Sequence, residues 1–229
     1  MDTRPWRMQL PPGVRWLEVD MPEVVAAKRR QLEQLGAALG PRPAGPEATA
    51  PTAHPLAAAS WTALSTDLGR PGWGAALRAA GLDPQHPTVW VAEGLLMYLE
   101  EGEVAALLRE AAAASAPGSV LIAHQCTREL ISMVQNASGA AAYAPFPPEL
   151  VTTWRSGLPP AGQAEALAAE LRSAGGWQLQ QATSRARIAA EICSSSGSDS
   201  SEDVTSYCDF EARPDAGRDR WAVFFVATV

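Results

Sequence analysis

The chain has 229 residues, of which 47% are hydrophobic and 19% charged, and its formal net charge is −7 at pH 7. This composition is typical of one folded domain with a sizeable core, and it excludes a largely disordered protein. The acidic balance argues against nucleic acid as the main partner, because binding to phosphates needs clustered basic residues. Three adjacent basic residues, Lys28, Arg29 and Arg30, are interpreted as one solvated helix face.

Strand-like and helix-like segments alternate along the chain. Hydrophobic runs predict strands over 14–19, 61–66, 88–92, 119–123 and 221–229, and a further strand begins at Trp177. Helical spacing of hydrophobic residues predicts helices over 21–39, 73–80, 101–115, 126–135 and 161–174. Continuously hydrophobic strands between helices are typical of a parallel sheet covered on both faces. We therefore predict an α/β fold with a doubly wound, mostly parallel sheet.

Two segments depart from this alternation. Residues 40–59 are rich in Pro and Ala and predict a loop insertion, whereas residues 194–219 include a low-complexity acidic stretch that predicts disorder. Insertions of this kind are tolerated in surface loops. We therefore expect residues 1–229 to form a single domain with two insertions.

The cysteines and histidines, three of each, are widely spaced in the sequence and form no CxxC or zinc-binding pattern. We therefore expect no metal site and a reducing compartment. No hydrophobic run reaches the length of a membrane span, and the first ten residues lack the core of a signal peptide. These features predict a cytoplasmic protein without a membrane partner, and an organelle is the alternative.

Three successive predicted strands are each followed by an acidic residue: Asp20, Asp67 and Glu93. Because the carboxyl ends of parallel strands meet at one edge, we expect these carboxylates to line one crevice. One carboxylate there can accept hydrogen bonds from both hydroxyls of a ribose. The second acid, Asp67, suits an adenine amine, and the neighbouring Leu68 would provide a hydrophobic wall or a backbone donor. The pattern predicts a nucleoside-type ligand.

Structural roles are the alternative for these acids. Asp20 would cap the following helix together with Glu23, and Asp67 would cap the turn before Trp73. Glu93 is harder to explain in this way, because it follows a buried strand and needs a partner or a cleft.

The order of these motifs resembles the leucine carboxyl methyltransferase family. The resemblance is carried by VDMPEVV over 19–25 with Lys28, by Asp67 and Leu68 followed by Trp73, and by AEGLLMYL over 92–99. It extends from Met1 to about Ala114. It implies a class I methyltransferase (Rossmann-like) fold with S-adenosyl-L-methionine as cofactor. It also implies methyl transfer to a carboxylate, on a protein C-terminus or a small molecule.

The resemblance also implies roles for individual residues. Asp20 is similar to the family's ribose-contacting acid, Asp67 and Leu68 to its adenine-contacting pair, and Glu93 to the acid near the methionine part. Asp2-Thr3-Arg4 resembles the end of the glycine-rich first motif, which makes Arg4 a further cofactor-binding candidate. No catalytic residue is assigned, because a carboxylate acceptor is already ionised near neutral pH and alignment is the main catalytic device.

In the family, the first strand and the glycines of that motif would lie before Met1. The resemblance therefore implies an N-terminally truncated fold, either as a shortened chain or as one that has lost activity. The alternative function is an inactive remnant acting as an interaction module. A dinucleotide-dependent oxidoreductase is disfavoured, because the sequence contains no GxGxxG motif. The sequence identifies neither the methyl acceptor nor the oligomeric state.

Two further residues are candidates for the acceptor pocket. Tyr98 and His124 would act there as a general base or an orienting group. Core packing is the alternative for Tyr98, and a position at the end of the sheet is the alternative for His124. The eight tryptophans are spread over many elements, which favours core packing over a cage for the cofactor's sulfonium group.

Overall fold

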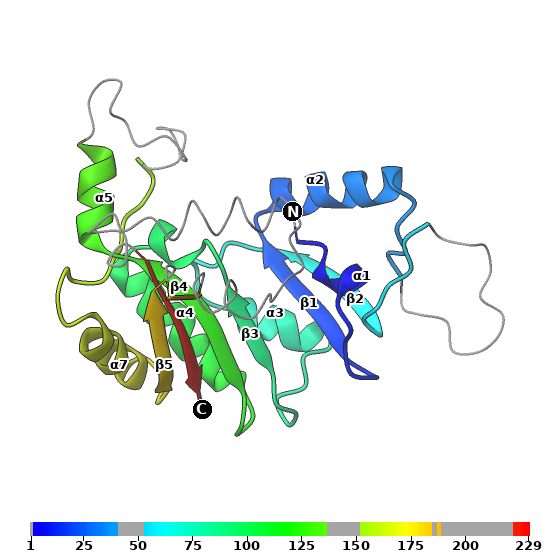
Figure 1. The fold of residues 1–229 in the computed structure, drawn as a ribbon. Coiled ribbons are helices and arrows are strands. Elements are labelled where there is room, and N and C mark those ends of the chain that lie inside the picture. Colours follow the sequence, from blue (N-terminus) through cyan, green and yellow to red (C-terminus); the bar gives the residue numbers. More distant parts are fainter. Residues whose placement is uncertain (1, 41–52, 137–151, 185–186, 189–221) are drawn as a thin grey trace, which may run out of the picture. The chain divides into compact units, whose positions relative to one another are not determined.

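A computed structural model describes residues 2–40, 53–136, 152–184, 187–188 and 222–229 (Figure 1). The described residues divide into two compact units, Met1–Asp83 and Pro84–Val229, and each unit is described separately. Most of the predicted insertion 40–59 and all of the predicted insertion 194–219 lie outside the described residues.

The first unit is built on two parallel strands, β1 (Arg15–Asp20) and β2 (Ser60–Ser65). The helix α2 (Pro22–Gln34) follows β1, and α3 (Trp73–Ala79) follows β2. A single-turn helix, α1 (Arg4–Arg7), precedes them. The predicted order of strands and helices is therefore confirmed for this part of the chain.

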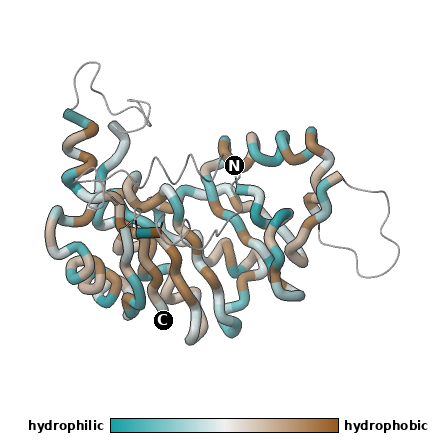
Figure 2. The backbone as a smooth tube through the Cα atoms, viewed as in Figure 1, coloured by the Kyte–Doolittle hydropathy of each residue, from teal (hydrophilic) through white to brown (hydrophobic). Residues whose placement is uncertain are grey.

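The helix α2 is shorter than the predicted segment 21–39. It ends at Gln34, because Gly36 adopts the left-handed conformation, with φ of 66°, that commonly terminates a helix. Val25 and Leu32 are buried as expected, but Leu35 is 54% exposed. Figure 2 shows hydrophilic and hydrophobic residues alternating along this helix.

The core of the first unit lies between α2 and β2. Leu32, Leu56, Ala58 and Trp61 form a buried cluster, and Trp6 packs against it. Leu56 and Ala58 come from the predicted loop insertion, so the last residues of that segment belong to the core. Trp6 donates a hydrogen bond to the carbonyl of Ala38 at 2.9 Å, which attaches the N-terminal turn to the core.

The second unit contains a four-stranded sheet with the order β3-β4-β6-β5. Its strands are β3 (Val89–Ala92), β4 (Val120–Cys126), β5 (Gln178–Ser184) and β6 (Ala222–Thr228). The strands β3 and β4 are parallel, and β6 is antiparallel to both of its neighbours. Only one strand of the four is therefore reversed, which agrees with a mostly parallel sheet.

The helices of this unit are α4 (Glu101–Ala113), α5 (Arg128–Gln135) and α7 (Gln163–Ser173), with a 3-10 turn at Leu96–Tyr98. One face of the sheet buries Leu121 and Phe225. Trp177 is fully buried and donates a hydrogen bond to the carbonyl of Leu108 in α4 at 2.9 Å. The other face leaves Val91 and Ile122 partly exposed. The well-packed core of this unit therefore lies on the α4 side.

The strand β4 is longer than the predicted segment 119–123. Its pairing with β3 ends at Ala123, but its pairing with β6 continues to Cys126. His124 therefore lies inside β4, opposite Phe224, and the expectation that it ends the strand was wrong.

Candidate functional site

Asp20 and Asp67 lie at the same edge of the β1–β2 pair. Asp20 is in register with Ser65, and its carbonyl accepts a hydrogen bond from the backbone N–H of Thr66 at 3.0 Å. Asp67 follows Thr66 directly, so both carboxylates come from the carboxyl ends of adjacent parallel strands. The local geometry needed for a ligand that contacts both acids is therefore present within the first unit.

The carboxylate of Asp20 is only partly used by the protein. Its Oδ1 accepts a hydrogen bond from the backbone N–H of Met21 at 2.8 Å, and no hydrogen bond from the described residues reaches Oδ2. The N-cap of α2 is Met21, without a side-chain cap, so the alternative capping box between Asp20 and Glu23 is not formed. Asp20 retains an acceptor oxygen for a ligand hydroxyl.

Asp67 closes a turn after β2. Its Oδ1 accepts a hydrogen bond from the backbone N–H of Gly69 at 2.9 Å, and its Oδ2 lies 3.3 Å from Nε of Arg70. The side chain is 45% exposed and that of Arg70 is 83% exposed, so this ion pair is weak and readily exchanged. The N-cap of α3 is Gly72, so Asp67 does not cap that helix, but it does cap the turn before Trp73, as the structural alternative predicted. Leu68, its predicted partner for adenine, is partly buried beside it.

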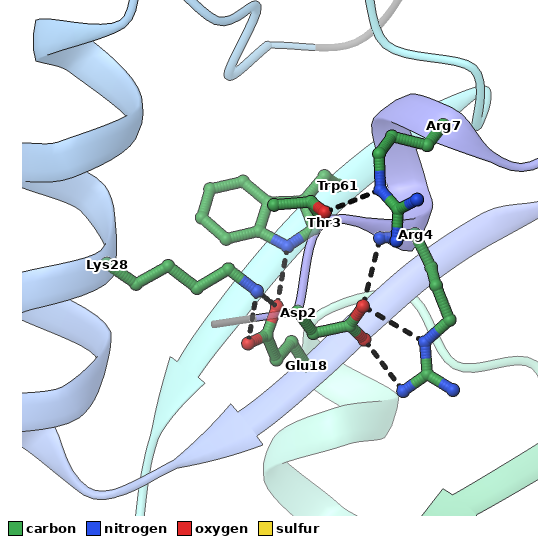
Figure 3. A network of polar contacts seen from close by, with 7 residues as sticks. All are labelled: Asp2, Thr3, Arg4, Arg7, Glu18, Lys28 and Trp61. Atoms are coloured by element: carbon green, nitrogen blue, oxygen red, sulfur yellow. Dashed lines mark hydrogen bonds and ion pairs between the residues drawn. The ribbon is translucent and has the colours of Figure 1, made fainter. Parts of the chain in front are cut away.

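A buried ion pair between Lys28 and Glu18 joins α2 to β1 in the same unit (Figure 3). Nζ of Lys28 lies 2.5 Å and 2.6 Å from the two carboxylate oxygens of Glu18, and only 5% of the lysine side chain is exposed. Trp61 on β2 donates a hydrogen bond from Nε1 to Glu18 at 2.9 Å. The interpretation of Lys28 as part of a solvated basic face was therefore wrong, although Arg29 and Arg30 are exposed.

The Lys28–Glu18–Trp61 network also positions the site. Glu18 precedes Asp20 by two residues and lies on the same face of β1, because side chains alternate along a strand. Anchoring Glu18 from both α2 and β2 therefore fixes the part of β1 that carries Asp20. Lys28 lies between Val25 and Leu32 at helical spacing, and that spacing is the signal from which its burial could have been predicted.

Arg4 is held by its neighbour Asp2. Nε and Nη2 of Arg4 donate to the two carboxylate oxygens of Asp2, each at 3.0 Å (Figure 3). The guanidinium also lies 5.9 Å from the ring centre of Trp16. Burial opposes ionisation of Asp2, but the hydrogen bonds and charge of Arg4, together with Lys28, lower the pKa of Asp2. The arginine is thus fixed close to β1.

Glu93 belongs to the second unit and directly follows β3. It is exposed, and Gly94 turns the chain with a left-handed φ of 63° before the 3-10 turn. Gly94, the residue after Glu93, contacts His124 through its backbone N–H, and the charge of Glu93 acts on the histidine ring, so Glu93 and His124 lie near each other. The exposed acid at the end of a strand agrees with a ligand-binding role for Glu93.

The ring of His124 is fixed by two contacts. Its Nδ1 accepts a hydrogen bond from the backbone N–H of Gly94 at 3.3 Å, and it stacks on Phe224 with ring centres 5.1 Å apart. Burial lowers the pKa of His124, and the nearby charge of Glu93 partly opposes this shift. The ring is therefore neutral at pH 7 and carries its proton on Nε2. In this tautomer Nε2 is a hydrogen-bond donor, which favours an orienting group over a general base as the candidate role of His124.

The lowered pKa of His124 predicts a loss of stability in acid. The unfolded chain takes up a proton near pH 6.5, whereas the folded chain takes it up only at lower pH. The stability of the protein relative to a His124→Phe variant should therefore fall as the pH decreases from 7.5 to 5. Urea unfolding of both chains at several pH values measures this difference. An increase of the relative stability in acid would contradict the prediction.

Tyr98 packs against a hydrophobic cluster and not into open space. The cluster consists of Met97, Cys126, Leu130, Ile131 and Trp154, and Tyr98 is partly buried against it. This arrangement agrees with the core-packing alternative for Tyr98. Trp73, Trp154 and Trp177 are likewise buried, as expected for core tryptophans.

The thiol of Cys126 should be unreactive in the folded protein. Burial raises its pKa to about 12, so almost no thiolate is present at neutral pH. In a Cys193→Ser/Cys208→Ser variant, a disulfide reagent such as 5,5′-dithiobis(2-nitrobenzoate) should react with the folded chain at least roughly a hundred times more slowly than with the chain in urea. Rapid labelling of the folded variant would contradict this expectation.

The described residues provide no metal site and no membrane span. Among them, no three His, Cys, Asp or Glu side chains are grouped closely enough to hold a metal ion. In the same part of the chain, no helix is both long and hydrophobic enough to cross a membrane.

Residues 1–112 match the sequence model of the leucine carboxyl methyltransferase family, which confirms the resemblance seen in the sequence. A "Putative S-adenosyl-L-methionine-dependent methyltransferase" from Frankia alni is 34% identical over 192 residues, which cover 83% of this chain and 55% of the relative. A protein with the same description from Mycolicibacterium smegmatis is 39% identical over 132 residues, which cover 58% of this chain and 38% of the relative. The chain thus spans between about a third and just over half of the length of the curated relatives it matches.

The comparison with solved structures supports the same fold. The crystal structure of a DUF574 family protein from Streptomyces avermitilis matches with a TM-score of 0.52 at 14% identity, over 93% of this chain and 64% of that protein. The predicted α/β fold with a mostly parallel sheet is confirmed.

Proposed function

We propose that this chain binds S-adenosyl-L-methionine and acts in methyl transfer. The observation that supports this most is the placement of Asp20 and Asp67 at one edge of two adjacent parallel strands, within the residues matched by the methyltransferase family. The ribose hydroxyls and the adenine amine of the cofactor are hydrogen-bond donors, and carboxylates are the acceptors that suit them. The residues present therefore fit the cofactor.

In this proposal each candidate residue has one role. Asp20 accepts hydrogen bonds from the ribose, and Asp67 with Leu68 contacts the adenine. Glu93 accepts a hydrogen bond from the methionine ammonium, and Arg4 is a further cofactor-binding residue. The cofactor supplies an electrophilic methyl group on a sulfonium sulfur.

We infer that the methyl acceptor is a carboxylate, on a protein C-terminus or a small molecule. An already ionised carboxylate would accept the methyl group without the protein having to move a proton. The demand on the protein is then alignment of the two reactants. The donor tautomer of His124 agrees with this scheme, because the scheme needs no general base.

Titration calorimetry with S-adenosylhomocysteine tests the proposal. We expect binding with a dissociation constant in the micromolar range, and an increase of roughly 2.7 kcal/mol in stability at a hundredfold excess over that constant. A cooperatively melting chain that shows neither heat of binding nor a shift in melting temperature would overturn the proposal. It would leave the interaction module as the remaining function.

A further inference from the structure

Glu93 and His124 form a pair of opposite hydrogen-bonding character at the end of the β3–β4 ladder. Val91 is in register with Ile122, and Ala92 with Ala123. Side chains alternate along a strand, so His124 lies on the same face of β4 as Ile122, and Glu93 lies just beyond the end of β3, next to Gly94, whose backbone N–H donates to His124. The hydrogen bond from Gly94 to His124, together with the effect of the Glu93 charge on the ring, places the two side chains within reach of one small ligand group.

The two side chains offer complementary groups to a ligand. Glu93 is an exposed carboxylate and accepts hydrogen bonds. His124 is locked by Gly94 and Phe224 with its proton on Nε2, and no hydrogen bond from the described residues reaches that atom. The ring is partly exposed, so Nε2–H is available as a donor.

This pair fits a ligand that carries a positive and a negative group together. A simple anion at His124 would be repelled by the neighbouring charge of Glu93. A simple cation would be satisfied by Glu93 but would leave the histidine donor unused. An α-amino-acid head, with an ammonium and a carboxylate on one carbon, uses both groups.

We propose that His124 donates a hydrogen bond from Nε2–H to the carboxylate of the cofactor's methionyl end, while Glu93 accepts one from its ammonium group. This inference rests on the proposed function, because S-adenosyl-L-methionine is the ligand of that function that carries such a head. It makes His124 a cofactor-binding residue, in place of its earlier candidacy for the acceptor pocket.

The test compares two ligands that differ only in the carboxylate. S-adenosylhomocysteine has both groups, whereas S-adenosyl-3-thiopropylamine retains the ammonium and lacks the carboxylate. His124→Phe preserves a ring that can stack on Phe224 and removes the donor. We expect it to weaken binding of S-adenosylhomocysteine about tenfold, as for a lost hydrogen bond to a charged group, and to leave binding of the propylamine ligand unchanged. Glu93→Gln should weaken the binding of both ligands.

A second variant separates binding from folding. His124→Gln retains a donor near the position of Nε2 and should keep most of the affinity for S-adenosylhomocysteine. An equal loss for both ligands in His124→Phe would mean that the ring acts only in packing, and would overturn the inference. Unchanged binding of S-adenosylhomocysteine in that variant would overturn it too, while leaving the proposed function intact. If the wild-type chain binds neither ligand, the proposed function itself fails.

Discussion

Replacing Lys28 with methionine should lower the free energy of unfolding of the first unit by about 3–5 kcal/mol, the range found when one partner of a buried ion pair is removed. Lys28 is 5% exposed, and Glu18, its partner, is 18% exposed. Methionine preserves the length and packing of the side chain but leaves the carboxylate without its countercharge. The hydrogen bond from Trp61 cannot compensate for this loss, because it is a single neutral donor.

Urea unfolding followed by tryptophan fluorescence measures this effect, and Trp61, one of the eight tryptophans of the chain, belongs to the network. Arg30→Met is the matched control, because Arg30 lies on the exposed side of the same helix and its replacement should change stability by no more than about 0.5 kcal/mol. A Lys28→Met/Glu18→Gln double variant removes both charges and should recover part of the loss. Equal stabilities of Lys28→Met and Arg30→Met would show that the ion pair is not a structural element of this chain.

Replacing Asp20 with alanine should weaken binding of S-adenosylhomocysteine by about 1–3 kcal/mol, which is roughly 5- to 150-fold, through lost charge-assisted hydrogen bonds to the ribose. The change removes the Oδ2 acceptor and also the contact with Met21. Asp20→Asn retains one carbonyl oxygen for these roles and should lose less affinity. Calorimetric titration of the unchanged chain, Asp20→Asn and Asp20→Ala with S-adenosylhomocysteine measures their affinities, which should decrease in that order.

Glu23→Ala is the control for general electrostatics. Glu23 lies in the first turn of α2, three residues from Asp20, and it is exposed. Its removal changes the net charge by the same amount as Asp20→Ala without altering the end of β1. If Asp20→Ala binds S-adenosylhomocysteine as tightly as the unchanged chain does, Asp20 does not belong to the proposed site. The same conclusion follows if Glu23→Ala loses as much affinity as Asp20→Ala.

The alternation of strands and helices, and the acids that follow three strands, could be read from local patterns. Asp20, Asp67 and Glu93 each stand where a hydrophobic run meets a polar residue, and this boundary is a property of a few neighbouring residues. The end of α2 was also encoded locally, in Gly36, but the hydrophobic residues beyond it suggested a longer helix. The left-handed conformation of Gly36 ends the helix although the spacing of hydrophobic residues continues beyond it.

Contacts between distant segments were not predicted from the sequence. The burial of Lys28 depends on Glu18 from β1 and Trp61 from β2, and nothing in the run of basic residues reveals these partners. The position of His124 within β4 depends on pairing with Phe224, a hundred residues later in the chain. The tautomer of that histidine follows from its contact with Gly94 across the ladder. Tertiary partners, and not propensity, set the properties of these residues.

The position of β6 between β4 and β5 has a consequence for synthesis on the ribosome. Of the strands in this sheet, β6 is the last to be translated, yet within the described residues it is the strand that joins β5 to the rest. Until it emerges, β5 has no neighbour in the sheet, and the exposed edge of β4 is open to pairing with other nascent chains. Such non-local pairing is slow to form, so this unit should mature after translation and benefit from a chaperone that shields the waiting strands.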